Sequence, residues 1–371
     1  MFWMPDQVRH DEPGIFYDAI IIRERMNDKL PLFRHAATGA ALGITASVAV
    51  AACTFSPETF ARISVLHPAY IPLLFLMVVT AWICNGLRTL TLSRALGSPL
   101  TLKQSLAISL STEFGIAASP AGMGGGLIRL TLMKRAGFQV HHVASFMAAD
   151  FTVDAAFFGI VLPVCLAASS KELLRLAPSL DFSLPSPDRT IIGLAVLGAI
   201  VFAAVQGGAA RVFLRITGMD RRFRLSARFR LIRRHIASDI RNTTSLIRFL
   251  YAHQKKALVA NFFLGGTQWL CRYGILPVIL FAFSRQGHFI PLFFVQGFLF
   301  VLSLALVIPG GGGGVEVVMA FILSFFIPAA LVGVVLILWR FFTYHLYLLV
   351  GGAASAWTFG SLNTLFPRPD A

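Results

Sequence analysis

Long apolar stretches without formal charge alternate with short charged connections along most of this chain. Six runs contain no Asp, Glu, Lys or Arg, namely Ala36–Pro57, Ile63–Leu87, Thr190–Ala210, Gln286–Val315, Val317–Trp339 and Phe341–Pro367. About 20 mainly apolar residues are enough for a helix to cross the hydrocarbon core of a bilayer, and each run is that long. The pattern predicts a polytopic membrane protein.

The fold class that we expect is an all-α polytopic membrane protein with about seven spanning helices. The predicted spans cover residues 36–56, 68–92, 140–168, 190–210, 257–283, 317–338 and 341–362. Two further segments, broken by proline and glycine, are expected to be re-entrant, and an inverted repeat would relate the two halves.

The distribution of charge predicts which segments face the cytoplasm. Arg23, Arg25, Lys29 and Arg34 precede the first span and place the N-terminus inside. Residues 104–119 would form only about 24 Å of helix, short for a crossing. If they did cross, the strongly basic segment 211–256 would face outside, against the positive-inside rule. A re-entrant segment is therefore favoured there.

The predicted organisation has five parts. Residues 1–35 form a cytoplasmic N-terminal segment, in which Met26 is a candidate native start. The first membrane half covers 36–210, with re-entrant segment 104–128, and is followed by the basic cytoplasmic loop 211–256. The second membrane half covers 257–362, with re-entrant segment 290–315, and 363–371 form a tail.

Composition narrows the class of protein. The chain of 371 residues is 56% hydrophobic and 13% charged, whereas soluble domains carry roughly 25% charged residues. Much of the net charge of +15 lies in 211–256, where thirteen Lys/Arg face two Asp, a net of +11. This pattern fits contact with anionic headgroups, and nucleic acid is not expected as a partner. Apolar residues of segment 211–256 fall at helical spacing. They predict either an amphipathic helix that lies on the cytoplasmic leaflet or a helix that packs on the protein itself.

The four cysteines lie in apolar stretches without CxxC spacing, and His/Cys clusters with zinc spacing are absent from the sequence. Neither a metal site nor a cofactor is expected.

Two matched breaks combine proline with glycine. The first contains Pro120, Gly122, Gly124, Gly125 and Gly126, and the second contains Pro309, Gly310, Gly311, Gly312, Gly313 and Gly314. Glycine leaves backbone amides open to a ligand, and a helix N-terminus favours an anion such as a headgroup phosphate. The alternative is that these glycines only allow helices to approach closely. A pair of such breaks is typical of a transporter binding site.

Ionisable residues at membrane depth are candidate functional residues because they are unfavourable there. Arg129 is a candidate phosphate partner, or else a positive-inside anchor. Three roles are open for Glu316: it is expected to cap a helix N-terminus, to relay a cation or proton, or to contact a cationic headgroup. The other candidates for proton transfer or buried ion pairing are Glu113, Asp150, Asp154, Arg272 and Arg340. Asp150 and Asp154 share a helix face and are expected to pair with Arg129 or Arg272.

The duplicated Pro-Gly segment resembles the lysylphosphatidylglycerol synthase transmembrane-region family, over most of residues 36–350. Pro309–Glu316 matches the family pattern of a Pro-Gly-Gly-x-Gly segment followed by Glu, whereas the first copy has Ala121 after its proline and lacks the acid. The resemblance implies a flippase-like protein of lipid translocation or envelope biosynthesis. The soluble aminoacyl-transferase domain of the synthases is not expected here, so we do not expect an enzyme.

The function that we expect is transport or flipping of a lipid or other amphiphile, with an anionic headgroup bound at the two breaks. The expected location is the bacterial inner membrane, and the expected partners are anionic phospholipids or lipid-linked intermediates. One alternative is a lipid-binding accessory protein that supports a biosynthetic enzyme. A second alternative is a membrane transferase that uses a lipid-linked donor.

Overall fold

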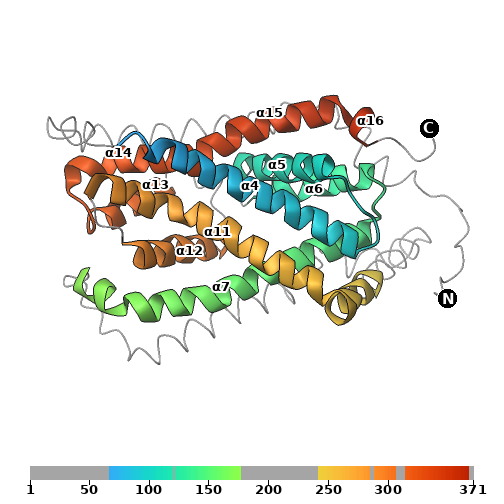
Figure 1. The fold of residues 1–371 in the computed structure, drawn as a ribbon, viewed down its shortest axis with the longest axis horizontal. Coiled ribbons are helices and arrows are strands. Elements are labelled where there is room, and N and C mark those ends of the chain that lie inside the picture. The colour runs from blue at the N-terminus through green and yellow to red at the C-terminus, as the bar shows by residue number, and fades with distance from the viewer. Residues whose placement is uncertain (1–66, 120–121, 177–240, 285–287, 306–313, 367–371) are drawn as a thin grey trace, which may run out of the picture.

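The structure is a computed structural model that describes residues 67–119, 122–176, 241–284, 288–305 and 314–366. All regular secondary structure in these ranges is helical, which confirms the all-α class (Figure 1). The predicted spans 36–56 and 190–210 lie outside the described residues, as do the N-terminal segment 1–35 and most of the basic loop.

Four helices make up the first part of the described chain. They are α4 (Tyr70–Ala95), α5 (Leu102–Ala118), α6 (Met123–Arg135) and α7 (Val140–Leu176). The second part has α11 (Lys255–Ser284), α12 (Phe289–Ala305), α13 (Gly314–Leu323) and α14 (Ala329–Arg340). A π-helical turn, η1 (Phe341–His345), joins α14 to α15 (Leu346–Gly360), and the short α16 (Leu362–Leu365) follows.

Three helices in the described ranges are long and apolar enough to cross a membrane. They are Tyr70–Ala95, Val140–Ser170 and Ala329–Gly360, which includes η1. The first two agree with the predicted spans 68–92 and 140–168. The helix α11 covers the predicted span 257–283.

One prediction about the spans is wrong. Segments 317–338 and 341–362 are not two successive spans, because α13 ends at Leu323 and a single helical rod runs from Ala329 to Gly360. Pro328 precedes α14 and lacks the N–H that a continuing helix would need. Arg340 therefore lies inside this rod, where it is buried, and does not mark the membrane edge.

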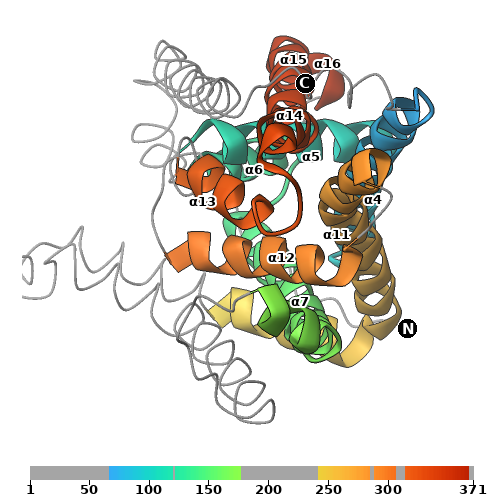
Figure 2. The ribbon, with the colours of Figure 1, turned by 90° about the vertical axis from the view of Figure 1, so that its left-hand side faces the viewer.

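Two sets of consecutive short helices, α5–α6 and α12–α13, occupy opposite halves of the molecule. Figure 1 shows α5 and α6 in the right-hand half and α12 and α13 in the left-hand half, while α4, α7 and α11 run across both. In each half of the sequence a long helix is followed by two short helices and then by another long one. Figure 2, turned by 90°, shows α4 beside α11, with α7 and the α14–α15 rod on opposite sides of the molecule.

The α5–α6 pair is held by capping and by close backbone packing. Thr101 and Gln104 form a reciprocal capping box at the start of α5. At the other end, the Ser119 hydroxyl donates to the Gly115 carbonyl (2.7 Å) and accepts from the Gly124 amide (2.8 Å). Gly122, at φ +70°, adopts the left-handed conformation that lets the chain reverse there.

The described end of the basic loop is helical from residue 241 to residue 253. Its Leu250 is fully buried, and Leu246 packs against the same core cluster, which includes Phe146 of α7. The Ser145 hydroxyl also donates to the Thr243 carbonyl (3.3 Å). This end of the loop therefore packs on the protein itself, whereas most of the predicted amphipathic helix lies outside the described residues.

Candidate functional site

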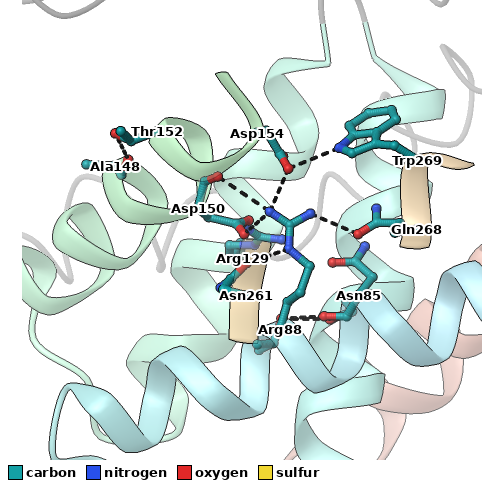
Figure 3. Close-up of polar contacts among 12 residues, drawn as sticks. Asn85, Arg88, Arg129, Ala148, Asp150, Thr152, Asp154, Asn261, Gln268 and Trp269 are labelled. Atoms are coloured by element: carbon teal, nitrogen blue, oxygen red, sulfur yellow. Dashed lines mark hydrogen bonds and ion pairs between the residues drawn. The ribbon is translucent and has the colours of Figure 1, made fainter. Parts of the chain in front are cut away.

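A buried arginine on α4 connects three helices. Arg88 donates through Nε to Asn261 Oδ1 (2.8 Å) and through Nη1 to Gln268 Oε1 (2.9 Å), both on α11. Its Nη2 contacts Asp150 Oδ1 (2.6 Å) and Asp154 Oδ1 (2.8 Å) on α7. Only 2% of the Arg88 side chain is exposed. Figure 3 shows its guanidinium surrounded by these four partners.

The two aspartates extend this network in different directions. Asp150 Oδ2 accepts from Arg129 Nη1 of α6 (2.9 Å), so one carboxylate bridges two arginines. Asp154 Oδ1 accepts a second hydrogen bond from Trp269 Nε1 (3.0 Å). Arg88, Arg129, Asp150 and Asp154, which we call the quartet, carry two positive and two negative formal charges, a sum of zero.

Space for the quartet depends on a glycine of α11. A Cβ on Gly265 would lie 3.2 Å from Arg88 Cζ and 3.4 Å from Asp154 Oδ1. Gly265 therefore allows α11 to approach the guanidinium closely.

A second ion pair, between a buried acid and a partly exposed arginine, joins α5 to α11. Arg272 Nη1 donates to Glu113 Oε2 (3.1 Å), and Asn85 Nδ2 donates to Glu113 Oε1 (2.9 Å). The Arg272 guanidinium also lies 4.6 Å from the centre of the Tyr347 ring, within cation–π range. The cation of this pair is thus held by an acid on one side and by an aromatic face on the other.

A third buried pair links α13 to the α14–α15 rod. Arg340 Nη2 lies 2.8 Å from Glu316 Oε1, and 1% of the Glu316 side chain is exposed. The contact is an ion pair without a well-aligned hydrogen bond, since neither Glu316 oxygen accepts one within the described part of the chain. Rings of Trp339 and Tyr344 lie 5.1 and 5.3 Å from the guanidinium.

The first glycine run is used for packing. Cβ atoms on Gly115 and Gly124 would lie 2.8 Å from backbone atoms of the opposite helix, α6 or α5. The Gly124 amide donates to Ser119 and the Gly125 amide donates to the Gly122 carbonyl, so both already have partners. This geometry favours the close-packing interpretation over an open set of amides.

Substitutions within this run provide a matched test. Gly124→Ala is expected to destabilise the protein by about 1–3 kcal/mol, because the new methyl group meets backbone that cannot rotate away. Gly126→Ala is the control, since its Cβ would meet only the end of Met147 at 3.4 Å. Denaturation in mixed detergent micelles would compare the two, and equal stabilities would contradict the packing role of Gly124.

Several predicted site residues lie outside the described part of the chain. These are Pro120, Pro309, Gly310, Gly311, Gly312 and Gly313. Gly314 is the first residue of α13, and Glu316 lies in its first turn.

The predicted pairing is confirmed in part by these contacts. Asp150 does pair with Arg129, but Arg272 pairs with Glu113 and not with either aspartate. Arg88 is not among the predicted site residues, although it is the centre of the largest network. A signal was present: Asn261, Gln268 and Arg272 are spaced by seven and four residues, which places three polar side chains on one face of an apolar helix.

The three ionic groups are electrically balanced. They contain four arginines and four carboxylates, so their formal charges sum to zero. The arginines are Arg88, Arg129, Arg272 and Arg340, and the acids are Glu113, Asp150, Asp154 and Glu316. Among the described residues, no group of three or more His, Cys, Asp or Glu side chains is arranged to hold a metal ion. What the arrangement offers is ion pairing between helices by charged groups that are mostly buried.

Comparisons with known proteins identify relatives of this chain. A family model described as the lysylphosphatidylglycerol synthase TM region matches residues 37–351. A protein of Archaeoglobus fulgidus described as a UPF0104 membrane protein is 27% identical over 323 residues, covering 84% of this chain and 94% of the relative.

Proposed function

The chain belongs to the lysylphosphatidylglycerol synthase transmembrane-region family, and we propose that it moves an amphiphilic lipid with an anionic headgroup across the bilayer. We place it in the bacterial inner membrane with its N-terminus in the cytoplasm. The family is described by a membrane region, not by a catalytic domain, and a transport role needs no covalent chemistry.

The observation that carries this proposal is the position of two sets of consecutive short helices in opposite halves of the molecule. Helices α5 and α6 lie in one half of the molecule and α12 and α13 in the other (Figure 1), and broken helices in corresponding positions of two halves are typical of transporters built from inverted repeats. Helix ends inside a membrane are tolerated where protein or a wet cavity surrounds them.

Buried charge near these helices supports the same proposal. Arg129 of α6 and Glu316 of α13 each belong to an ion pair whose partner lies on another helix. Charged groups at membrane depth are found mainly along substrate or ion pathways. An anionic headgroup could exchange with the carboxylate that an arginine holds in the absence of lipid.

Lipid translocation in proteoliposomes tests the proposal. Labelled anionic and zwitterionic phospholipids would be compared for the wild type, Arg129→Ala, Glu316→Gln and a control, Arg94→Gln, at an exposed position of α4. Arg129→Ala is expected to slow movement of the anionic lipid by about tenfold or more, because a hydrogen bond to a charged group contributes roughly 1.5–3 kcal/mol. Glu316→Gln is expected to slow it as well, because it removes the carboxylate that pairs with Arg340.

The control variant is expected to match the wild type. A correctly folded wild type that moves no lipid of the panel would overturn the proposal. Retention of a biosynthetic enzyme during purification would then favour the accessory role.

A further inference from the structure

Asp154 differs from its neighbours in how its two oxygens are used. Glu113 and Asp150 each have a donor on both oxygens. Asp154 receives both of its hydrogen bonds, from Arg88 and Trp269, on Oδ1, which leaves Oδ2 without a hydrogen bond among the described residues. With 23% of its side chain exposed, it is also the most accessible member of the quartet.

Arg129 has unused hydrogen-bonding capacity on the same network. Its only hydrogen bond within the described chain runs from Nη1 to Asp150, although a guanidinium carries five N–H donors. Its Nε is buried and has no hydrogen-bond partner there. The Phe146 ring lies 5.2 Å from its guanidinium carbon. A buried guanidinium with free donors is suited to an oxyanion such as phosphate.

The charge balance of the quartet links these two features. A proton that binds Asp154 Oδ2 breaks none of the observed hydrogen bonds, because Oδ1 can still accept from Arg88 and Trp269. It does change the formal charge of the quartet from zero to +1. An uncompensated charge at this depth is strongly unfavourable, and an anion beside Arg129 would neutralise it.

We propose that the quartet binds one anionic phosphate group and one proton together, with the phosphate at Arg129 and the proton on Asp154 Oδ2. The inference rests on the proposed function and adds to it a coupling ion, so that an anionic headgroup would enter the protein with a proton. By thermodynamic linkage, each of the two ligands then strengthens the binding of the other.

The groups that face Asp154 leave it as the proton acceptor of this site. Helix α4 presents Arg88, which stays charged at accessible pH. Helix α11 presents Trp269, which donates, and Tyr273, whose ring packs on that of Trp269. Asp150, on the same helix, is held by two arginines, and α12 contains no ionisable side chain.

Binding measurements at several pH values test the coupling. The probe is a fluorescent short-chain phosphatidylglycerol added to the purified full-length protein in detergent, with short-chain phosphatidylcholine as the zwitterionic comparison. Glycerol 3-phosphate forms a third arm, which separates a lipid ligand from a soluble phosphate. Over the pH range in which Asp154 has lost its proton in the lipid-free protein but keeps it in the lipid-bound protein, affinity for the anionic lipid is expected to fall by about tenfold per pH unit.

Two variants separate this inference from a structural role for Asp154. Asp154→Asn mimics the protonated acid, so it is expected to bind the anionic lipid at neutral pH more tightly than the wild type does, with no dependence on pH. Thr152→Val is the matched control on α7, because the Thr152 hydroxyl donates to the Ala148 carbonyl of its own helix (2.7 Å) and to no other group in the described ranges. It should keep the wild-type pH dependence.

The outcomes separate the inference from the proposed function. Wild-type binding that does not change with pH overturns proton coupling and leaves lipid binding intact. Equal pH dependence in Asp154→Asn and the wild type also overturns it. Absence of binding to any anionic lipid overturns both proposals. Tighter binding of glycerol 3-phosphate than of the anionic lipid would show that the ligand is a soluble phosphate and not a lipid headgroup. If Asp154→Asn cannot be purified, the wild-type pH series still decides.

Discussion

Replacing Arg88 by Met is expected to destabilise the protein by about 3–5 kcal/mol. The variant leaves the carboxylates of Asp150 and Asp154 against one remaining arginine, and it removes the hydrogen-bond partner of Asn261 and Gln268. Breaking a buried ion pair from one side is strongly unfavourable because the other charge stays buried and uncompensated. Denaturation in mixed detergent micelles, together with the yield of folded protein, would measure the effect.

A second substitution shows whether charge is the cause. In the double variant Arg88→Met/Asp154→Asn the remaining Arg129 and Asp150 balance each other, so part of the lost stability is expected to return. Arg94→Met is the control, since Arg94 lies on the same helix at an exposed position. An Arg88→Met protein as stable as this control would show that the network contributes little to the fold.

The class of protein and the main helices follow from the sequence because membrane thickness imposes a length. An apolar run near 20 residues has few other stable environments, which explains why the predicted spans 68–92 and 140–168 agree with α4 and α7. The wrong division at Arg340 has an equally physical origin. A lone arginine between apolar runs indicates a membrane edge, unless an acid elsewhere in the chain neutralises it.

Which charges pair could not be read from local patterns. Arg88 is separated by 62 residues from Asp150 and by 173 from Asn261, so no helical spacing brings them together. The spacing of Asp150 and Asp154, one turn apart, predicts that they share a helix face, and both do contact Arg88. Assigning Arg272 to Glu113 requires that α5 and α11 both pack on α4, which only the fold provides.

The role of the first glycine run also depends on the fold and not on its residue types alone. Its residues permit either an exposed row of amides or close helix contact. The position of Ser119, which binds the Gly124 amide, and the reversal at Gly122 decide between these alternatives. Neither the Ser119 hydrogen bond nor the reversal at Gly122 can be recognised from a repeat or a charge in the sequence. The sequence is therefore compatible with both interpretations of the glycine run.

The two partners of the Glu316–Arg340 pair are expected to respond differently to substitution. Arg340→Met leaves a carboxylate that is fully buried, and the expected loss of stability is about 3–5 kcal/mol. Glu316→Gln keeps a polar group beside Arg340, whose cation also lies near the Trp339 and Tyr344 rings. The expected loss is about 1–2 kcal/mol, because cation–π contacts still stabilise the arginine.

This asymmetry matters because Arg340 stands at the junction of the two helix pairs. Arg340 reaches α13, while Tyr344, one turn further in η1, donates to the Ala117 carbonyl at the end of α5 (3.3 Å). A π-helical turn at such a point is often associated with function. Stability curves in mixed detergent micelles for both variants, with Arg340→Lys to keep the charge, would test the asymmetry. If Glu316→Gln proved as unstable as Arg340→Met, the buried carboxylate would not be the source of the effect.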